Sequence, residues 1–278
     1  MSPTVADVNA AVGRLWPVAG AEPWDAVGLI AGDLGAPVSS ILLAVDAVLD
    51  TVREAVETRT DLLLVHHPLL LRGVTSVASE TYKGSVLTTL IRANCALISA
   101  HTNADVVATG TSATFAAKLG LVNQRPIVAA ADPTRGIGRI GELEHPTTLG
   151  RLARALGELL PATATGIRVS GDFDAPVTTI ALCGGAGDAY LSEPAVLAAD
   201  VYITSDLRHH PASEARENAR ASELSGGSGG PALIDVSHWA SEWLWLDSAA
   251  SELRAALPGV TVTVSDIRTD PWDFVVTQ

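Results

Sequence analysis

Short apolar runs alternate with longer amphipathic stretches along most of this chain. In its first part, runs rich in Leu, Ile and Val at 41–45, 62–65 and 95–99 have the length and composition of buried strands. The intervening stretches near 46–56 and 81–93 place apolar residues at helical spacing. Strands that alternate with helices of this length indicate βαβ units, so we predict an α/β fold with a largely parallel sheet.

A second series of predicted strands and helices begins near Arg125. Its predicted strands lie at 126–130, 137–143, 177–183, 201–204 and 233–236. A last helix is expected at 239–257 and a last strand at 260–267. We therefore predict two α/β lobes with mixed, largely parallel sheets, residues 1–125 and 126–278. Whether the last helix and strand pack on the first lobe stays open.

Composition narrows the possible partners. The 278 residues include 18 basic and 31 acidic side chains, a net charge of −13, with no basic stripe of the kind that binds nucleic acid. No apolar run approaches the ~18 residues that cross a bilayer, and the first residues do not resemble a signal peptide. Cys95 and Cys183 lie in apolar surroundings, as buried reduced thiols do. We expect a cytoplasmic protein with neither nucleic-acid nor membrane partners.

Histidines follow the predicted strands. The strand at 62–65 ends in His66, His67 and Pro68. Pro68 favours an extended conformation at His67, so both rings can enter one crevice at the carboxyl edge of the sheet. This doublet suits two neighbouring metal ions, with one imidazole bound to each. A histidine pair on a surface loop is the alternative.

Two further polar segments resemble the first. His101 and Asp105 follow the strand at 95–99, where Asp105 is able to bridge two metal ions or, alternatively, to cap a helix. His238 and Glu242 lie four residues apart after the strand at 233–236, a spacing that places them on one helix face. A solvated hydrogen-bonded pair is the alternative for these last two residues.

Taken together, the three segments supply imidazoles and carboxylates for a dinuclear centre. The candidate metal ligands are His66, His67, Asp105, His238 and Glu242. Mixed nitrogen and oxygen ligands favour Zn, Mn, Fe or Co, and we expect two divalent ions per chain. A fourth segment after the strand at 201–204 supplies Asp206, His209 and His210 as substrate-binding or supporting groups.

The order of these motifs resembles that of the NGG-interacting-factor-three-like family, whose members carry the name type 2 homologue of GTP cyclohydrolase I. The resemblance covers about residues 4–270, and the chain lacks the central domain inserted in longer members. The segments that carry it are WDAVGLIAGD (24–33), LLLVHHPLLLRG (62–73), ISAHTNADV (98–106), TSDLRHHPASEA (204–215) and LIDVSHWASEW (233–243). Ala26, Ser205 and Ser237 depart from the usual Asn, Gly and Gly of that pattern, and none of the three is a ligand position.

The resemblance implies a two-lobed subunit, a homohexameric toroid and a dinuclear metal centre in the cleft between the lobes. It assigns the five candidate residues above as metal ligands, places His101 beside the site and places Lys83 near the cleft.

We therefore expect a metal-dependent hydrolase of a small substrate, with a nucleotide such as GTP as one candidate. His101 is its predicted catalytic proton carrier, and Lys83, Asp206, His209 and His210 are its predicted substrate-binding residues. The alternative is a non-catalytic metal-binding scaffold, a storage protein or a ring that docks partners. The sequence leaves open whether the protein is an enzyme.

Overall fold

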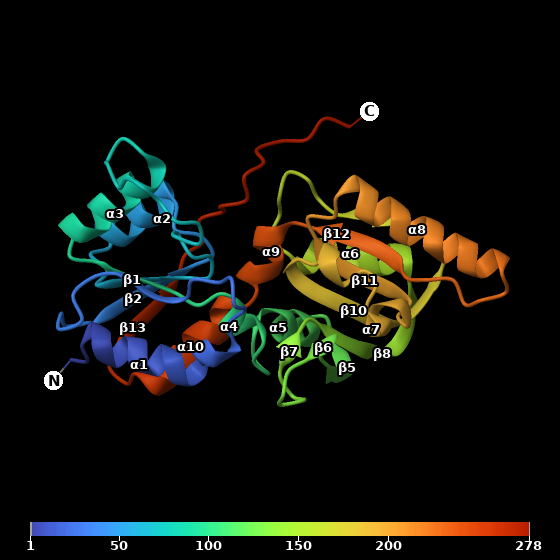
Figure 1. The fold of residues 1–278 in the computed structure, drawn as a ribbon, viewed down its shortest axis with the longest axis horizontal. Coiled ribbons are helices and arrows are strands. Elements are labelled where there is room, and N and C mark those ends of the chain that lie inside the picture. The colour runs from blue at the N-terminus through green and yellow to red at the C-terminus, as the bar shows by residue number, and fades with distance from the viewer. Residues whose placement is uncertain (1, 278) are drawn as a thin grey trace. The chain divides into compact units, whose positions relative to one another are not determined.

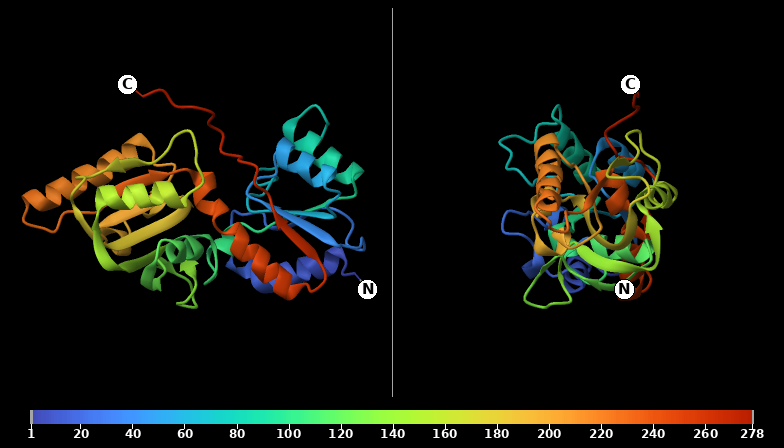
Figure 2. Two further views of the ribbon diagram at one scale, coloured as in Figure 1. Left: turned by 180° about the vertical axis from the view of Figure 1, so that it is seen from behind. Right: turned by 90° about the vertical axis from the view of Figure 1, so that its right-hand side faces the viewer.

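The computed structural model describes residues 2–277 and divides into two compact units (Figures 1 and 2). Unit 1 is formed by the chain up to Val107 together with Trp245–Thr269. Unit 2 is formed by Ala108–Leu244 together with the segment from Asp270 onward. Each unit has a mixed sheet with helices, which confirms the predicted α/β class.

The sheet of unit 1 has five strands in the order β1-β4-β3-β2-β13. Their bounds are Gly28–Ala31 (β1), Ala96–Ser99 (β4), Leu62–Val65 (β3), Ser40–Ala44 (β2) and Thr261–Val264 (β13). Only β1 is antiparallel to its neighbour, and the other four strands are parallel. The carboxyl ends of β2, β3 and β4 therefore lie at the same edge of the sheet.

Helices cover both faces of this sheet. They are α1 (Val5–Leu15), α2 (Leu49–Glu57), α3 (Tyr82–Arg92), α4 (Thr102–Asp105) and α10 (Leu246–Ala256), with a short 3₁₀ helix at Val18–Gly20. In Figures 1 and 2, α2 and α3 lie on one face and α1 and α10 on the other. Thr4 is the N-cap residue of α1, and the side chains of Thr4 and Asp7 cap the helix reciprocally.

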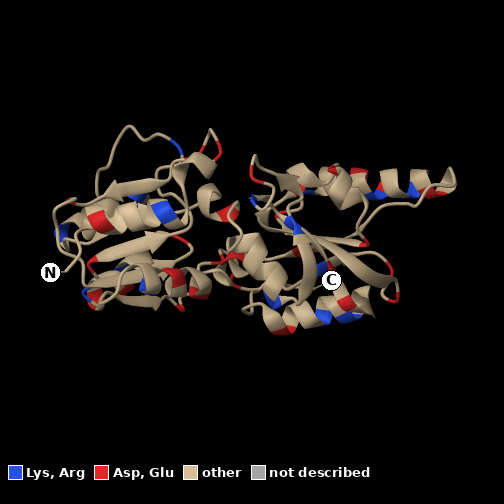
Figure 3. Cartoon of the chain, turned by 90° about the horizontal axis from the view of Figure 1, so that it is seen from below, with Lys and Arg blue, Asp and Glu red and all other residues tan. Residues whose placement is uncertain are grey.

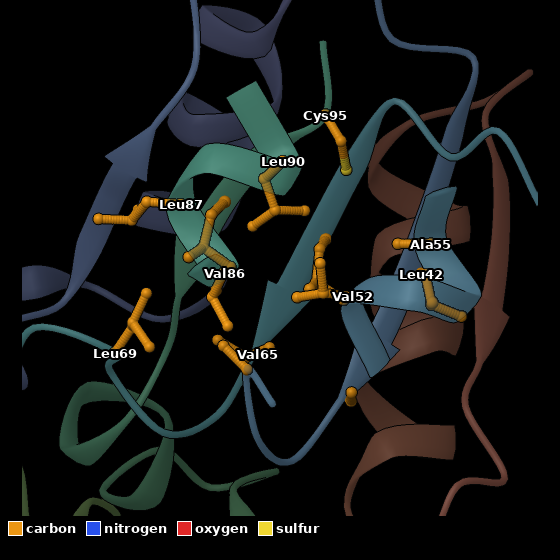
Figure 4. Packing of buried hydrophobic residues seen from close by; sticks show 13 residues of the cluster. Leu42, Val52, Ala55, Val65, Leu69, Val86, Leu87, Leu90 and Cys95 are labelled. Atoms are coloured by element: carbon orange, nitrogen blue, oxygen red, sulfur yellow. The ribbon is translucent and has the colours of Figure 1, made fainter. Parts of the chain in front are cut away.

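A buried apolar cluster attaches α2 and α3 to the sheet (Figure 4). Alternate strand residues such as Leu42, Leu63 and Leu97 face it, because successive side chains of a strand point to opposite faces. Val52 of α2 and Leu90 of α3 pack from the helix side. A one-residue shift of any strand would turn its leucines away from this cluster, so the cluster fixes the strand register and the positions of the strand ends.

The sheet of unit 2 has six strands in the order β5-β8-β10-β11-β12-β9. Their bounds are Leu121–Arg125 (β5), Arg139–Thr148 (β8), Pro176–Ala186 (β10), Val201–Ser205 (β11), Ala232–Val236 (β12) and Arg168–Ser170 (β9). The strands β10, β11 and β12 are parallel, and the remaining pairs are antiparallel. A small hairpin of β6 (Val128–Ala129) and β7 (Gly136–Ile137) precedes β8.

The helices of unit 2 also lie on both faces of its sheet. They are α5 (Thr111–Lys118), α6 (Leu149–Leu159), α7 (Pro194–Leu197), α8 (His209–Leu224) and α9 (His238–Trp243), with a 3₁₀ helix at Asp188–Tyr190. Val196 of α7 and Ala212 of α8 pack against Tyr202 and Leu233 of the sheet. Because Leu233 is buried beneath α8, the first turns of that helix are fixed against β12.

The single last helix predicted at 239–257 is two helices. The first, α9, ends at Trp243 in unit 2, and α10 begins at Leu246 in unit 1. Trp245 lies between them and is fully buried, with its ring 5.0 Å from that of Trp16. Apolar spacing alone does not reveal such a break, because both helices and the residues between them are apolar on their buried sides.

Charged side chains are spread over both units. Figure 3 shows Asp and Glu on the elements of each unit, with Lys and Arg interspersed among them. Within residues 2–277, every helix is too short or too polar to cross a lipid bilayer.

Candidate metal centre

Three histidines of unit 1 converge beyond the ends of two adjacent strands. His66 and His67 follow β3, and His101 lies two residues after β4. The backbone N–H of His66 donates to the carbonyl oxygens of Ala44 and Val45, which extends the pairing of β2 and β3 as far as the histidine. The centroid of the His66 ring is 5.1 Å from the centroids of both other rings, and one ligand atom from each of the three lies within 4.8 Å of the others.

Asp105 completes the unit 1 ligand group, which we define as the candidate metal ligands His66, His67 and Asp105 together with His101, the candidate proton carrier beside them. Its Oδ1 lies 3.6 Å from Nε2 of His66, which is fully buried. Asp105 is the last residue of α4, whose N-cap position is occupied by His101. The alternative role of Asp105 as a helix N-cap is therefore wrong, and its carboxylate faces an imidazole instead.

Each ring of the group is oriented through its Nδ1 atom. Nδ1 of His66 lies 2.8 Å from the Ala100 carbonyl oxygen, and Nδ1 of His67 lies 2.7 Å from Oδ1 of Asp46. Nδ1 of His101 lies 2.9 Å from Oδ1 of Asp25. A carbonyl or ionised carboxylate oxygen only accepts, so Nδ1 is the donor and a neutral ring carries its lone pair on Nε2. This is the outer hydrogen bonding typical of metal-bound histidines.

Asp25 is a site residue that the sequence analysis missed. Its carboxylate also accepts from the backbone N–H of Thr102, at 3.0 Å, and from the Thr102 hydroxyl. Burial raises the pKa of the Asp25 carboxyl, but these hydrogen bonds and His101 outweigh it and hold the pKa below its ordinary value. Burial and neighbouring His66 lower the pKa of His101 despite two nearby carboxylates, so its ring is neutral at pH 7.

Asp46 is a second residue that was missed. The apolar spacing predicts Asp46 at the start of a helix, but α2 begins at Leu49. The Asp46 carboxylate instead lies beyond the end of β2, where it accepts from His67 and, through its other oxygen, from the Thr269 hydroxyl. The signal that selected the histidines, a polar residue directly after a buried strand, also marks Asp46.

Unit 2 holds a separate unit 2 ligand group of His238 and Glu242. Both lie on α9. Ser237 is the N-cap residue of this helix, and its side chain accepts from the backbone N–H of Ala240. Nε2 of His238 lies 3.0 Å from Oε1 of Glu242, and its Nδ1 lies 2.7 Å from Oδ2 of Asp206. Asp206 follows β11 with a φ of 58°, a left-handed conformation that Asp tolerates better than most residues.

The backbone of β10 leaves room for the unit 2 ligand group only because Gly185 has no side chain. A Cβ at Gly185 would lie 2.3 Å from Oε1 of Glu242 and 3.1 Å from Nε2 of His238.

Burial lowers the pKa of His238, but Glu242 and Asp206 outweigh it and raise the pKa well above its ordinary value. That shift reports a negative potential at the ring, and the same potential attracts a metal ion.

The residues present fit divalent metal ions. Both groups offer imidazole nitrogens and carboxylate oxygens, the donors that Zn, Mn, Fe and Co accept.

Of the residues predicted to bind substrate, Asp206 contacts His238, Lys83 is the second residue of α3, and His209 and His210 begin α8. The last two rings contact each other edge to face, with centroids 5.2 Å apart.

Sequence comparison identifies relatives over the full chain. The profile of the Duf34/NIF3 (NGG1p interacting factor 3) family matches residues 3–271. A Streptomyces coelicolor protein named GTP cyclohydrolase 1 type 2 homolog is 45% identical over 277 residues, covering 97% of this chain and 94% of that protein. A Mycobacterium tuberculosis protein of the same name is 34% identical over 388 residues, covering 99% of this chain and 98% of that protein. The longer alignment means that the mycobacterial protein carries residues that this chain lacks.

Solved structures have the same fold. A Bacillus cereus protein related to NIF3 superposes with a TM-score of 0.88 at 21% identity, over 99% of this chain and all of that one. A Staphylococcus aureus hypothetical protein superposes with a TM-score of 0.85 at 26% identity, again over 99% of this chain and all of that one. The profile match, the sequence identity and the fold agree, and the chain belongs to the Duf34/NIF3 family.

Proposed function

We propose that this protein binds two divalent metal ions and uses them to hydrolyse a small substrate. The proposed ligands are His66, His67, Asp105, His238 and Glu242. The observation that carries the proposal is the fixed orientation of the histidines, since Nδ1 of each ligand ring is held by an oxygen acceptor. Rings held in this way present Nε2 as the ligand atom.

The number of ligands favours catalysis over a purely structural site. Five protein ligands for two ions leave coordination positions for water and substrate, whereas structural metal sites are closed by protein groups. When bound, such ions lower the pKa of coordinated water and polarise the bond to be broken. His101 is suited to accept a proton at Nε2, because Asp25 fixes its other nitrogen and its ring is neutral at pH 7.

A nucleotide-like substrate is supported by the surface beside the unit 1 ligand group. Trp24 is 59% exposed, and its ring centroid lies 6.0 Å from that of His101. An exposed indole next to a catalytic group offers a flat surface on which a heteroaromatic base stacks. Together with the name of the relatives, this makes GTP the first substrate to test, with hydrolytic opening of the purine ring as the reaction.

Elemental analysis of the purified protein tests the metal centre. We expect about two divalent ions per chain, because the five proposed ligands form a two-metal site. His66→Ala and Glu242→Gln should each lower the metal content while the far-UV circular dichroism stays unchanged. The control is His145→Ala, an exposed histidine of β8 outside both ligand groups, which should bind as much metal as the wild type. Equal metal content in all three variants would contradict the proposed ligands.

Turnover assays then distinguish a metal-dependent hydrolase from a non-catalytic metal-binding scaffold. Metal-loaded wild type should convert GTP or another member of a panel of nucleotides, phosphoesters and amides, and His101→Ala should lose most of that activity while it retains its metal. If the metal-loaded protein leaves the whole panel unchanged, the hydrolase proposal fails and a metal-binding scaffold takes its place.

We also propose that the chain assembles into a homohexamer. Self-association is supported by apolar side chains near the end of the chain, since Trp272, Phe274 and Val276 are 61%, 80% and 75% exposed. Light scattering should give a mass of six times 28.7 kDa. A monomeric mass at micromolar concentration would contradict the assembly.

A further inference from the structure

A basic pocket lies in unit 2 and is lined by residues of β9, β12, the segment after β11 and the first turns of α8. Its volume is about 370 Å³, and three of its lining residues are Arg168, Arg208 and Arg216. The whole chain has 18 basic residues and a net charge of −13. Three guanidinium groups around one pocket are therefore a strong local concentration of positive charge.

Carboxylates pair with two of these arginines, and the third guanidinium group leaves the surroundings of the pocket with a net positive charge. Nε of Arg168 donates to Oδ2 of Asp235 at 2.8 Å, and Oδ1 of Asp235 accepts from the backbone N–H of Leu207 at 3.0 Å. Nε of Arg208 donates to Oδ2 of Asp188, which does not line the pocket, at 2.7 Å. Asp235 is the only acidic residue in the lining of the pocket within the described chain.

Arg216 adds the third charge from a half-buried position. It lies seven residues after His209 and three after Ser213, so these side chains share one face of α8 and line the same pocket. Burying part of a guanidinium group costs free energy unless an anion or hydrogen-bond acceptor compensates it. An anionic ligand in the pocket provides that compensation.

The remaining lining identifies the kind of anion. Leu207 and the core residue Leu233 give the pocket an apolar floor, and Ser170 and Ser213 add hydroxyl donors. Guanidinium groups recognise phosphate oxygens in a bidentate manner, and an apolar floor accepts the organic part of a phosphate ester. We propose that this pocket binds a small phosphate monoester with an apolar or aromatic body.

This site goes beyond the proposed metal-dependent reaction. Neither ligand group contributes a residue to the pocket, and every lining residue belongs to unit 2. The pocket should therefore bind its ligand when all metal has been removed, so the test does not depend on the metal centre.

Calorimetric titration of the full chain in excess EDTA, with phenyl phosphate as the probe, tests the proposal. We expect saturable binding of phenyl phosphate, weaker binding of inorganic phosphate, which lacks the apolar body, and no binding of phenol. In a ¹⁵N-labelled sample, the backbone amides of Ser170, Leu207 and Ser213 should shift on titration. The absence of saturable phenyl phosphate binding, or binding that shifts amides elsewhere only, would overturn the proposal.

Two matched variants on α8 locate the binding. Arg216→Gln should weaken phenyl phosphate binding at least about tenfold, the loss expected for a charge-assisted hydrogen bond. Arg220→Gln is the control, because Arg220 lies one turn further along α8, outside the pocket, and pairs with Glu217 at 3.0 Å. An equal loss in both variants would mean that net charge alone attracts the probe, and the pocket would then be rejected. Arg208→Gln provides a second pocket variant should Arg216→Gln fail to fold.

Discussion

The histidines of the two ligand groups are fixed by acceptors that come from other parts of the chain. Asp46 holds His67, Asp25 holds His101 and Asp206 holds His238, each through Nδ1. Such partners keep a proton on Nδ1, so that Nε2 of a neutral ring can bind a metal ion; at His238, whose pKa is raised, the ion would displace the proton on Nε2. Under the proposed function, these carboxylates would raise metal affinity through the rings that they orient.

Asp46→Asn tests this role at a single residue. The carboxamide keeps the shape of the side chain but removes the negative charge that makes His67 a stronger ligand. Metal affinity, measured by competition with a chromogenic chelator, should fall about 10–100-fold. The matched control is Asp50→Asn, an exposed residue in the first turn of α2 that pairs with Arg53 at 3.2 Å. Identical affinities for the two variants would show that Asp46 has no influence on the metal.

Gly185→Ala tests the space around the unit 2 ligand group. The new methyl group would lie 2.3 Å from Oε1 of Glu242, and the φ of 72° disfavours any side chain. We expect displacement of Glu242, loss of bound metal and about 1–3 kcal/mol lower stability. Gly184→Ala is the control, because its Cβ would meet no atom closer than 3.7 Å. Thermal unfolding measures the stability, and elemental analysis measures the metal content. Equal stability and equal metal content of the two variants would contradict the proposed crowding.

The sequence identified the histidines of the site and, among the carboxylates that hold them, Asp206 as a supporting group, but neither Asp25 nor Asp46. His66, His67, His101 and His238 each follow an apolar run, and that local pattern is visible without a structure. Their partners are distant along the chain, since 76 residues separate Asp25 from His101 and 32 separate Asp206 from His238. Asp25 follows no apolar run, so in the sequence it looks like any surface or helix-capping residue.

At the scale of elements, the unit 1 ligand group depends on three parallel strands that end together. The backbone of His66 bonds to the residues that end β2, so the carboxyl ends of β2 and β3 are aligned. At the opposite ends of the same strands, the Asp61 carboxylate accepts from the backbone N–H groups of Ser39 and Ser40, at 2.8 and 3.0 Å, and from both hydroxyls. This carboxylate ties the start of β2 to the start of β3.

The Asp61 contacts predict a pH-dependent stability of unit 1. Burial raises the pKa of this carboxyl, but the four hydrogen bonds from Ser39 and Ser40 outweigh it and lower the pKa below its ordinary value. A group with a lowered folded-state pKa contributes stability that is complete above its unfolded pKa of about 3.9 and is lost as the pH falls through the folded pKa. Asp61→Asn should therefore lower the free energy of unfolding by about 1 kcal/mol at pH 7.

The difference between wild type and Asp61→Asn should shrink below about pH 4, where the wild-type carboxyl also becomes protonated. Urea unfolding between pH 3 and pH 7 measures it, with the exposed Glu57→Gln as the control. A difference that stays constant down to pH 3 would show that the carboxylate charge is not what stabilises these strands.

Buried strands were easier to predict than edge strands. The predicted runs at 62–65 and 95–99 correspond to β3 and β4, whose residues are all buried. The strands β1 and β9, which are antiparallel to their neighbours and lie at the edges of their sheets, were not predicted. Edge strands are short and half-exposed, so they lack the continuous apolar run that identifies a central strand.

At the scale of the whole molecule, the chain passes from one unit to the other more than once. Unit 1 is completed only by Trp245–Thr269, which supplies α10 and β13. The residues of β13 pair with β2, as Val262 does with Ile41, and the buried Trp245 ring contacts the rings of Trp16 and His66. The unit 1 ligand group therefore depends on residues that follow unit 2 in the sequence.

A shortened chain that ends at Leu244 tests whether unit 2 stays folded when unit 1 lacks its last segment. It retains all six strands of the unit 2 sheet, because β12 ends at Val236, but it removes β13, α10 and Trp245. We expect unit 2 to remain folded and unit 1 to unfold, since loss of the buried α10 face and of the tryptophan pair removes more apolar burial than a marginally stable domain tolerates.

Hydrogen exchange measured by mass spectrometry distinguishes the two units in that shortened chain. Amides of β10, β11 and β12 should stay protected, and those of β2, β3 and β4 should exchange rapidly. A chain that ends at Thr269 is the control, because it keeps α10 and β13, and its β2–β4 amides should be protected as in the full chain. Protection of β2–β4 in the chain that ends at Leu244 would mean that unit 1 folds from its first segment alone. In that case His66, His67 and His101 would be held in place without Trp245, and the last part of the chain would have no structural role in the unit 1 ligand group.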